Sequence, residues 1–292
     1  MTGVAGTGRI ETRADGTLRI LQLTDFHNDA GDALAERTYH DIRALVSLTH
    51  PDLLAVTGDI WCGDETPQEA PALMDRDLAF LGSLDVPWAF AWGNHDYVGD
   101  LTVSLDKIRA TPNALAPLGD GKGSFRIEVV APATENPLWD LYFLNSRLEW
   151  ELPRDLEWFE AESACATEKR GANLPAIVYV HIPLIEFERA RQDGSYVGIA
   201  QEEVLHWGDD GRVFDAFRRA GNARACFVGH SHVNDFYCTV EGIVLGYGRA
   251  TGHGGYGGDQ LAKGAKLLTL DTRRTAFSFE TLFPDATRWQ PE

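Results

Sequence analysis

The stretch "VPWAFAWGNHD", residues 86–96, is an apolar run that ends in three polar side chains. Its apolar part is typical of a buried strand. Asn94, His95 and Asp96 follow directly, and burying such polar groups without partners costs free energy. The strand therefore ends either at the protein surface or at a site that uses these three groups.

The same pattern of buried strands and amphipathic helices extends back toward the start of the chain. Strands are predicted at 18–24, 52–59 and 86–96, with helices between them at 32–50 and 67–84. This alternation favours an α/β fold in which at least part of the sheet is parallel. The Asp-Gly pair at 15–16 predicts a hairpin that joins the strand at 18–24 to a shorter strand before it.

The rest of the chain adds mostly strands. Buried strands are predicted at 123–130, 138–146, 176–181 and 223–232, with helices at 153–170 and near 211–220. We expect four antiparallel strands in the C-terminal part, placed together in a second, mixed sheet, at 235–240, 242–248, 265–271 and 276–282. The sequence has no repeat or linker, so residues 1–292 are expected to form one domain.

Composition restricts the partners of the chain. With 26 basic and 44 acidic residues its formal net charge is −18, which disfavours duplex nucleic acid. A small phosphate ester stays compatible, because local cations can reverse the field. No apolar run is long enough to cross a bilayer, and the first residues lack a signal-peptide pattern. We therefore expect a cytoplasmic protein without a membrane partner, unless a leader precedes this sequence. The four cysteines lack a CxxC spacing and are expected to be reduced.

Polar residues of similar chemistry recur at the ends of five predicted strands, where ligand sites form in open α/β sheets. They include five of the nine histidines in the chain. A lone strand-end histidine or aspartate is usually a cap or a solvated group, but five coincident endings indicate a metal site. Imidazole and carboxylate together suit Mn, Fe, Zn or Co, and the ligands are too many for one ion, so two divalent ions are predicted. The polar residues at the five strand ends are Asp25, His27, Asp59, Asn94, His95, Asp96, His181, His230 and His232.

Three further residues are candidates for contacting the substrate: Asn28, which follows the first block, and Arg249 and His253, which lie about 20 residues after the last one. Each has a simpler alternative. Asn28 suits a turn, and the glycines around His253 are typical of a tight loop with close backbone approach. Residues 189–211 form a long polar stretch between two blocks, which favours either a substrate-facing lid or a plain surface loop.

Taken in order, "DFH", "GD", "GNHD", "VYVH" and "GHSH" resemble the five sequence blocks of the calcineurin-like metallophosphoesterase superfamily. The resemblance implies an α/β fold of four layers, an α/β/β/α sandwich of two mixed β-sheets flanked by helices. It also implies that Asp59 bridges two metals and that His95 lies near the scissile phosphate. Asp25, His27 and His232 would bind one metal, and Asn94, His181 and His230 the other.

The segment after the last block resembles the purple-acid-phosphatase-like branch of the Dcr2 type, in which a Gly- and Tyr-rich stretch follows the metal ligands. True purple acid phosphatases carry GDxxY, and their tyrosine gives the ferric centre its colour. This chain has "GDIWC", with Cys62 at the tyrosine position and His27 as an added ligand. The comparison implies ordinary divalent metals in place of a purple ferric centre.

These residues together predict a dinuclear metal-dependent phosphoesterase. It would hydrolyse phosphomonoesters by attack of a metal-bound hydroxide, while His95 assists at the phosphate or the leaving group. Asp96 would orient His95 or cap the following helix. The substrate would be a small phosphate ester or a phosphoprotein side chain. The alternatives are a phosphodiesterase for small or cyclic nucleotide-type diesters and a non-catalytic metal-binding scaffold; the sequence gives no oligomeric state.

Overall fold

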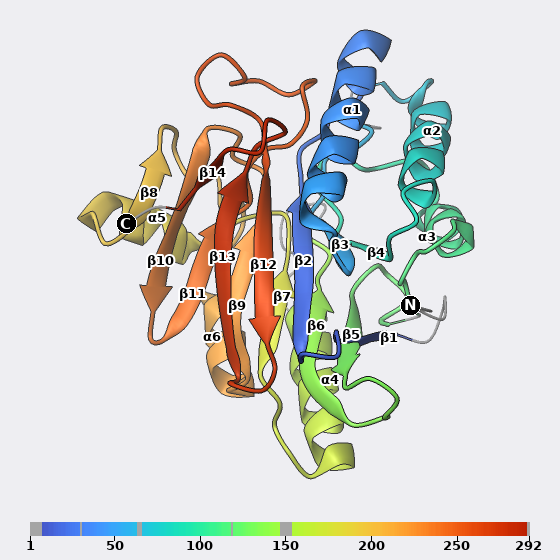
Figure 1. The fold of residues 1–292 in the computed structure, drawn as a ribbon. Helices are drawn as coiled ribbons and strands as arrows, with labels where there is room; N and C mark the ends of the chain where they lie inside the picture. Colours follow the sequence, from blue (N-terminus) through green and yellow to red (C-terminus); the bar gives the residue numbers. More distant parts are fainter. Residues whose placement is uncertain (1–7, 30, 63–65, 118, 147–153, 291–292) are drawn as a thin grey trace.

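Two mixed β-sheets form the centre of the protein (Figure 1). The computed structural model describes residues 8–29, 31–62, 66–117, 119–146 and 154–290. The six-stranded sheet has the order β14 (Arg288–Trp289), β13 (Ala276–Leu282), β12 (Ala265–Asp271), β2 (Thr17–Leu23), β3 (Leu53–Val56) and β4 (Trp88–Phe90). The eight-stranded sheet has the order β1 (Arg9–Glu11), β5 (Phe125–Val130), β6 (Pro137–Phe143), β7 (Ala176–Tyr179), β9 (Ala223–Val228), β11 (Ile243–Tyr247), β10 (Asn234–Val240) and β8 (Val197–Ala200).

Each sheet is covered by three helices on its outer face. Helices α1 (Asp32–Thr49), α2 (Ala70–Gly82) and α3 (Leu101–Ala110) share one apolar cluster with β2, β3 and β4. Helices α4 (Arg154–Arg170), α5 (Ile185–Asp193) and α6 (Arg212–Ala220) share a second cluster with β7, β9 and β11. These helices place their apolar side chains on one face, as amphipathic surface helices do.

A third apolar cluster lies between the two sheets. Leu18, Ile20 and Leu53 of the six-stranded sheet pack there with Ile177 and Phe227 of the eight-stranded sheet, and all five are buried. Three apolar layers therefore separate four layers of secondary structure. This confirms the predicted α/β/β/α sandwich of two mixed sheets.

Two predicted strand arrangements are wrong. The turn at Asp15 and Gly16 forms, but β1 pairs in parallel with β5 while β2 enters the other sheet, so there is no hairpin. The C-terminal strands are antiparallel as predicted, β10 with β11 and β12 with β13, but the first pair joins the eight-stranded sheet and the second the six-stranded one. Local turn and apolar signals identified these strands but not the sheet that each joins, because that is decided by the core they bury.

Two helices lie where none was predicted. Helix α3 begins after Asp100, whose side chain accepts hydrogen bonds from the backbone N–H groups of Thr102 and Val103. The end of helix α5 and strand β8 occupy the first half of the segment 189–211. That segment is therefore partly regular structure and not one long loop.

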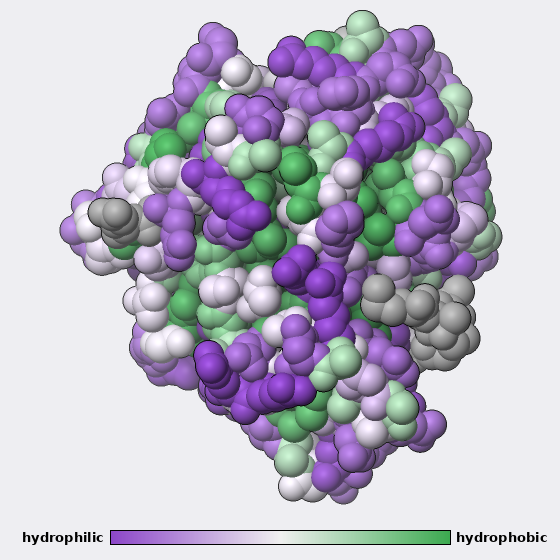
Figure 2. Space-filling model, viewed as in Figure 1, coloured by the Kyte–Doolittle hydropathy of each residue, from purple (hydrophilic) through white to green (hydrophobic). Residues whose placement is uncertain are grey.

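The polarity of the surface and the state of the cysteines are those expected from the composition. Figure 2 shows hydrophobic residues mainly toward the middle of the face in view and hydrophilic residues around its edge. Cys62, Cys165, Cys226 and Cys238 are free thiols, as expected. Among the described residues, no helix combines the length and the apolar character that a bilayer span requires.

Candidate metal centre

The topology brings the five predicted blocks to one place. Strands β2, β3 and β4 run parallel in one sheet, and β7 and β9 run parallel in the other. Their carboxyl ends therefore lie at the same edge of each sheet, and the loops that follow them meet there. Asp25, His27, Asp59 and Asn94 come from the six-stranded sheet. The eight-stranded sheet contributes His181, His230 and His232.

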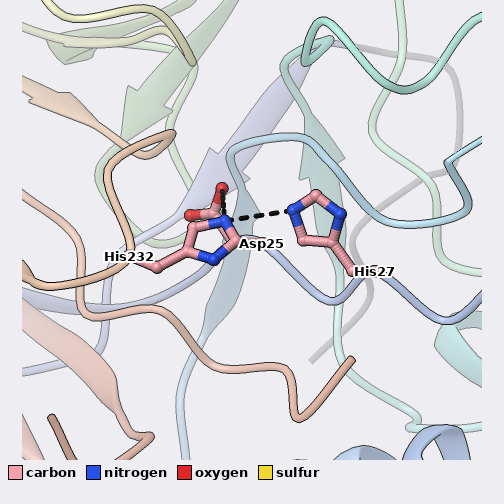
Figure 3. A group of neighbouring side chains, drawn as sticks. All are labelled: Asp25, His27 and His232. Carbon is pink, nitrogen blue, oxygen red and sulfur yellow. Dashed lines mark hydrogen bonds and ion pairs between the residues drawn. The ribbon is translucent and has the colours of Figure 1, made fainter. Parts of the chain in front are cut away.

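The first group consists of Asp25, His27 and His232, whose ligand atoms all lie within 4.8 Å of one another. The Nε2 atoms of His27 and His232 are 3.0 Å apart, and His232 Nε2 is 3.4 Å from Asp25 Oδ1 (Figure 3). In Figure 3 the two imidazoles point toward each other from different parts of the fold. This group can hold one ion.

The second group consists of Asp59, His181 and His230. His181 Nε2 lies 3.0 Å from Asp59 Oδ2, 3.2 Å from His230 Nδ1 and 3.0 Å from the Oδ1 atom of Asn94. Asp59 Oδ2 is also 3.7 Å from His27 Nε2 of the first group. The Asp59 carboxylate therefore lies between the two groups, where a bridging ligand would be placed.

The donor set fits a pair of cations. His181 Nδ1 lies 2.7 Å from the Thr57 carbonyl, which can only accept, so Nδ1 carries a hydrogen and Nε2 is the atom that a metal would bind. Without an ion, Nε2 faces two acceptors, the Asp59 carboxylate and the Asn94 oxygen, and is held there as a protonated donor. Among the described residues, His230 Nε2 and His232 Nδ1 are buried without a hydrogen-bond partner. A metal ion among these atoms would take the place of the His181 proton and be coordinated by them.

The charges of the cluster suit metal binding. Burial opposes ionisation of Asp25, but the hydrogen bond and charge of His232 outweigh it and lower the pKa of this carboxyl to about 2. Burial lowers the pKa of His27 to about 4 and, with His181 nearby, that of His230 to about 3. Burial also disfavours the charged form of His181, yet the Asp59 carboxylate dominates and raises its pKa to about 9. Ionised carboxylates and neutral imidazoles are the forms that bind metals, so His181 would have to release its proton when a metal binds.

Several ligands have an unusual backbone conformation. Asp25, His27, Asp59 and His230 have φ angles of 56°, 48°, 55° and 77°, in the left-handed region that few non-glycine residues adopt. The motif glycine Gly93 is equally constrained, because a Cβ there would lie 2.1 Å from Asp59 Oδ1. Such strain persists only where the surroundings enforce it, and it is typical of functional sites.

His95 lies beside the two groups. Its backbone N–H donates to Asp59 Oδ1 at 2.9 Å, and its ring centre is 5.4 Å from that of His27. The side chain is partly exposed, whereas Asp25 and Asp59 are almost completely buried. This position lets His95 reach a ligand that contacts the metal centre from solvent.

Asp96 is placed where it holds two loops together, and it does not cap the following helix. Its carboxylate accepts hydrogen bonds from the backbone N–H groups of Asp59, Ile60 and Gly93 at 2.7–2.8 Å. Burial and the Asp59 charge raise the pKa of Asp96 to about 6, and the N–H donors oppose that rise. The cap of the following helix is Asp100. Asp96 therefore ties the loop after β3 to the loop after β4.

The three residues expected at the substrate have other partners. Asn28 donates to Asp77 Oδ1 at 2.9 Å. Arg249 pairs with Asp235 at 2.7 Å and lies against the rings of Phe283 and Trp289. His253 Nε2 is 2.7 Å from Asp41 Oδ2, and the residue lines a cavity of about 710 Å³ beside α1. In the described part of the chain, the polar contacts of these three side chains are with residues outside the two metal groups.

The alternative interpretation of the glycines is supported instead. A Cβ at Gly254 would lie 1.7 Å from the His27 carbonyl oxygen, and one at Gly255 would lie 2.4 Å from His232 Cε1. The loop after β11 therefore packs directly against the first metal group. Only glycine allows that approach.

Sequence reasoning missed several residues around the histidines. The Tyr256 ring stacks on His232 with 4.0 Å between ring centres, and Trp207 lies 4.6 Å from His230 in an edge-to-face contact. Cys62 Sγ is 2.7 Å from His27 Nδ1. The signal that could have found Tyr256 is an aromatic residue inside a glycine-rich loop next to a metal block. Nothing in the local sequence indicates Trp207.

Comparisons with known proteins agree with this site. Residues 18–234 match the family described as calcineurin-like phosphoesterase. The "Probable inactive purple acid phosphatase 28" of Arabidopsis thaliana is 28% identical over 88% of this chain and 76% of that protein. The "Phosphatase DCR2" of Saccharomyces cerevisiae is 25% identical over 83% of this chain but only 49% of that protein.

A solved structure shows the same fold. The dimetal phosphatase from Danio rerio has a TM-score of 0.60 at 12% sequence identity, over 90% of this chain and 98% of that chain. This likeness concerns the fold alone. The family match, in contrast, spans more than half of the sequence and includes all five blocks. This chain belongs to the calcineurin-like phosphoesterase family, and its relatives include purple-acid-phosphatase-like proteins.

Proposed function

We propose that this protein is a dinuclear metal-dependent phosphoesterase that hydrolyses phosphomonoesters. The observation that carries the proposal is the pair of adjacent His/carboxylate groups, with the Asp59 carboxylate between them. Asp25, His27 and His232 would hold one ion. Asn94, His181 and His230 would hold the other, and Asp59 would be shared by both. Ions that accept mixed nitrogen and oxygen ligands, such as Mn, Fe, Zn or Co, suit this set.

The chain provides the charge that such a reaction needs. Two bound divalent ions would supply hydroxide near neutral pH and neutralise charge on the phosphate. The seven ligands include only two carboxylates, Asp25 and Asp59, so the occupied site would be locally positive. A small phosphate ester would therefore be attracted in spite of the net charge of −18.

His95 is the residue proposed to act on the substrate. Its backbone is fixed by the hydrogen bond to Asp59, while its ring stays partly exposed beside His27. From there it would hydrogen-bond the phosphate or give a proton to the leaving oxygen. General acid catalysis of this kind contributes on the order of 10²–10⁴-fold. Asp96 would act only through the loops, as a positioning residue.

Two other functions are alternatives. A phosphodiesterase acting on small diesters would use the same ligand set. A scaffold without activity is suggested by the name of the Arabidopsis relative, "Probable inactive purple acid phosphatase 28". Against a scaffold, each of the seven ligand positions holds a metal-binding side chain, and the structure brings these side chains together.

The test is hydrolysis by protein stripped with a chelator and then reloaded with Mn, Zn, Co, Fe or Mg. We expect nearly two ions per chain and turnover of p-nitrophenyl phosphate above that of bis-p-nitrophenyl phosphate. Asp59→Asn should abolish turnover and reduce the metal content, whereas His95→Ala should keep two ions and lose on the order of 10²-fold in kcat. Exposed Asp106→Asn and His40→Ala serve as matched controls. Two bound ions without turnover of either ester would overturn the proposal in favour of a scaffold, and faster diester turnover would favour a phosphodiesterase.

A further inference from the structure

Two exposed aromatic side chains lie directly against histidines of the two metal groups. Trp207 is 38% exposed and contacts the ring of His230, while Tyr256 is 52% exposed and stacks on His232. One ring thus stands at the second metal group and the other at the first. Both belong to segments without a metal ligand of their own.

The two rings are held in place by their surroundings. The Tyr256 hydroxyl donates to Glu202 Oε2 at 2.6 Å, and Glu202 Oε1 accepts the backbone N–H of Val233 at 2.9 Å. Glu202 therefore ties the glycine-rich loop to the segment that carries Trp207, five residues further on. That segment is fixed at its other end by Asp209, which is buried and accepts the backbone N–H of Ile185 at 2.8 Å. Rigid aromatic rings bind at a low entropic cost.

Exposed aromatic rings on their own need no explanation, because single apolar side chains are common on protein surfaces. Among the described residues, however, only seven large hydrophobic side chains are exposed, and two of these seven touch histidines of the metal groups. An aromatic ring whose only role is to support a metal-binding histidine would be expected to be buried. These rings instead support the histidines and remain open to solvent.

We propose that Trp207 and Tyr256 form a stacking subsite for a planar aromatic group on the phosphate ester. The inference rests on the proposed function, because the metal centre must hold the phosphate. An ester bound beside His230 and His232 would have its alcohol portion next to the exposed rings. Aromatic rings stack with any planar π-system in an offset or edge-to-face geometry, so the subsite favours aryl or nucleobase-bearing esters over alkyl esters.

The experiment uses unreactive competitors with the metal-loaded protein. Phenylphosphonate and methylphosphonate carry the same anionic group and differ in the ring. We expect phenylphosphonate to bind about tenfold more tightly to the native protein, and Trp207→Ala or Tyr256→Ala to lose most of that preference. Methylphosphonate should change less than about twofold, and Trp207→Phe should restore the preference. Leu48→Ala, which also removes an exposed apolar side chain, is the matched control.

Further arms of the test locate the ring and separate the two proposals. Comparing the affinities of adenosine 5′-phosphate and ribose 5-phosphate tests whether the subsite also binds a base that lies further from the phosphate. Equal binding in both pairs by the native protein would overturn the subsite, even if phosphate esters are hydrolysed. The subsite would also be overturned if Trp207→Ala and Tyr256→Ala lose equal affinity for the aromatic and the non-aromatic member of each pair, since such a loss would show a structural role. If calorimetry shows an aromatic preference that depends on Trp207 while no ester is hydrolysed, the subsite stands and the hydrolase function fails.

Discussion

Replacing Asp96 with asparagine changes one atom at the junction of two metal-binding loops. Asp96 Oδ2 accepts the backbone N–H groups of Asp59 and Gly93, and Oδ1 accepts that of Ile60. Asparagine has one side-chain oxygen, so its NH₂ group must face at least one of these donors. A hydrogen bond to a charged group contributes about 1.5–3 kcal/mol, and a buried N–H without an acceptor costs about 1–3 kcal/mol. We therefore expect Asp96→Asn to lower the free energy of unfolding by about 3 kcal/mol and to displace Asp59.

Urea denaturation of the metal-free protein measures this loss without the contribution of bound ions, and metal content then reports on Asp59. Asp77→Asn is the matched comparison. Asp77 is equally buried, but its hydrogen bonds from Asn28 and Tyr39 reach Oδ1 alone, and among the described residues Oδ2 has no partner. An asparagine there keeps the acceptor that is used and removes a buried carboxyl group, so Asp77→Asn should not lower the free energy of unfolding. If Asp96→Asn loses less than about 1 kcal/mol and still binds two ions, the three N–H contacts do not hold the loops.

Two further predictions concern Cys62 and Asp77. Because Cys62 Sγ lies 2.7 Å from His27 Nδ1, Cys62→Ala should weaken metal binding about 10–100-fold in a competition titration with a chelator. Cys62→Ser should recover most of the lost affinity. If Cys62→Ala binds metal as tightly as the native protein, the thiol does not position His27. Burial raises the pKa of Asp77 from 3.8 to about 7, so its contribution to stability is complete below about pH 4 and is lost as the pH rises toward 7. Asp77→Asn should remove this decline, which is worth up to about 4 kcal/mol, and parallel pH–stability curves for the two proteins would contradict the assignment.

The clustering of the candidate ligands could be predicted from the sequence because each follows a recognisable buried strand. The apolar runs before Asp25, Asp59 and His181 are short and continuous, as strands covered on both faces require. Once such strands are parallel, their carboxyl ends must share an edge, and the polar residues behind them converge. Asp96 shows where this reasoning stops. Its place in the sequence identified the site, but its role depends on backbone N–H groups in a loop that begins 37 residues earlier.

Strand pairing and the outer parts of the site could not be predicted in this way. Strand β1 carries three residues, and nothing in them distinguishes β2 from β5 as a partner. Likewise, Arg249 follows the last metal block in the sequence, yet its side chain pairs with buried Asp235, which also pairs with Lys266 of β12. Charges that the fold brings together decide such contacts, and local composition does not contain them. Trp207 shows the opposite: it lies in a polar segment of the sequence, yet its aromatic ring contacts His230.

Each candidate metal group takes its side chains from both sheets, which explains why the fold can hold such a cluster. His232 reaches the first group from the eight-stranded sheet, and Asp59 reaches the second from the six-stranded one. Direct hydrogen bonds also join the two sides: His181 Nδ1 to the Thr57 carbonyl, and the His230 N–H to Asp25. Burying so many polar groups together costs free energy, and several of the candidate ligand residues have strained φ angles. The apolar layer between the sheets must oppose both effects, so the inter-sheet core is what organises the metal ligands before any ion binds.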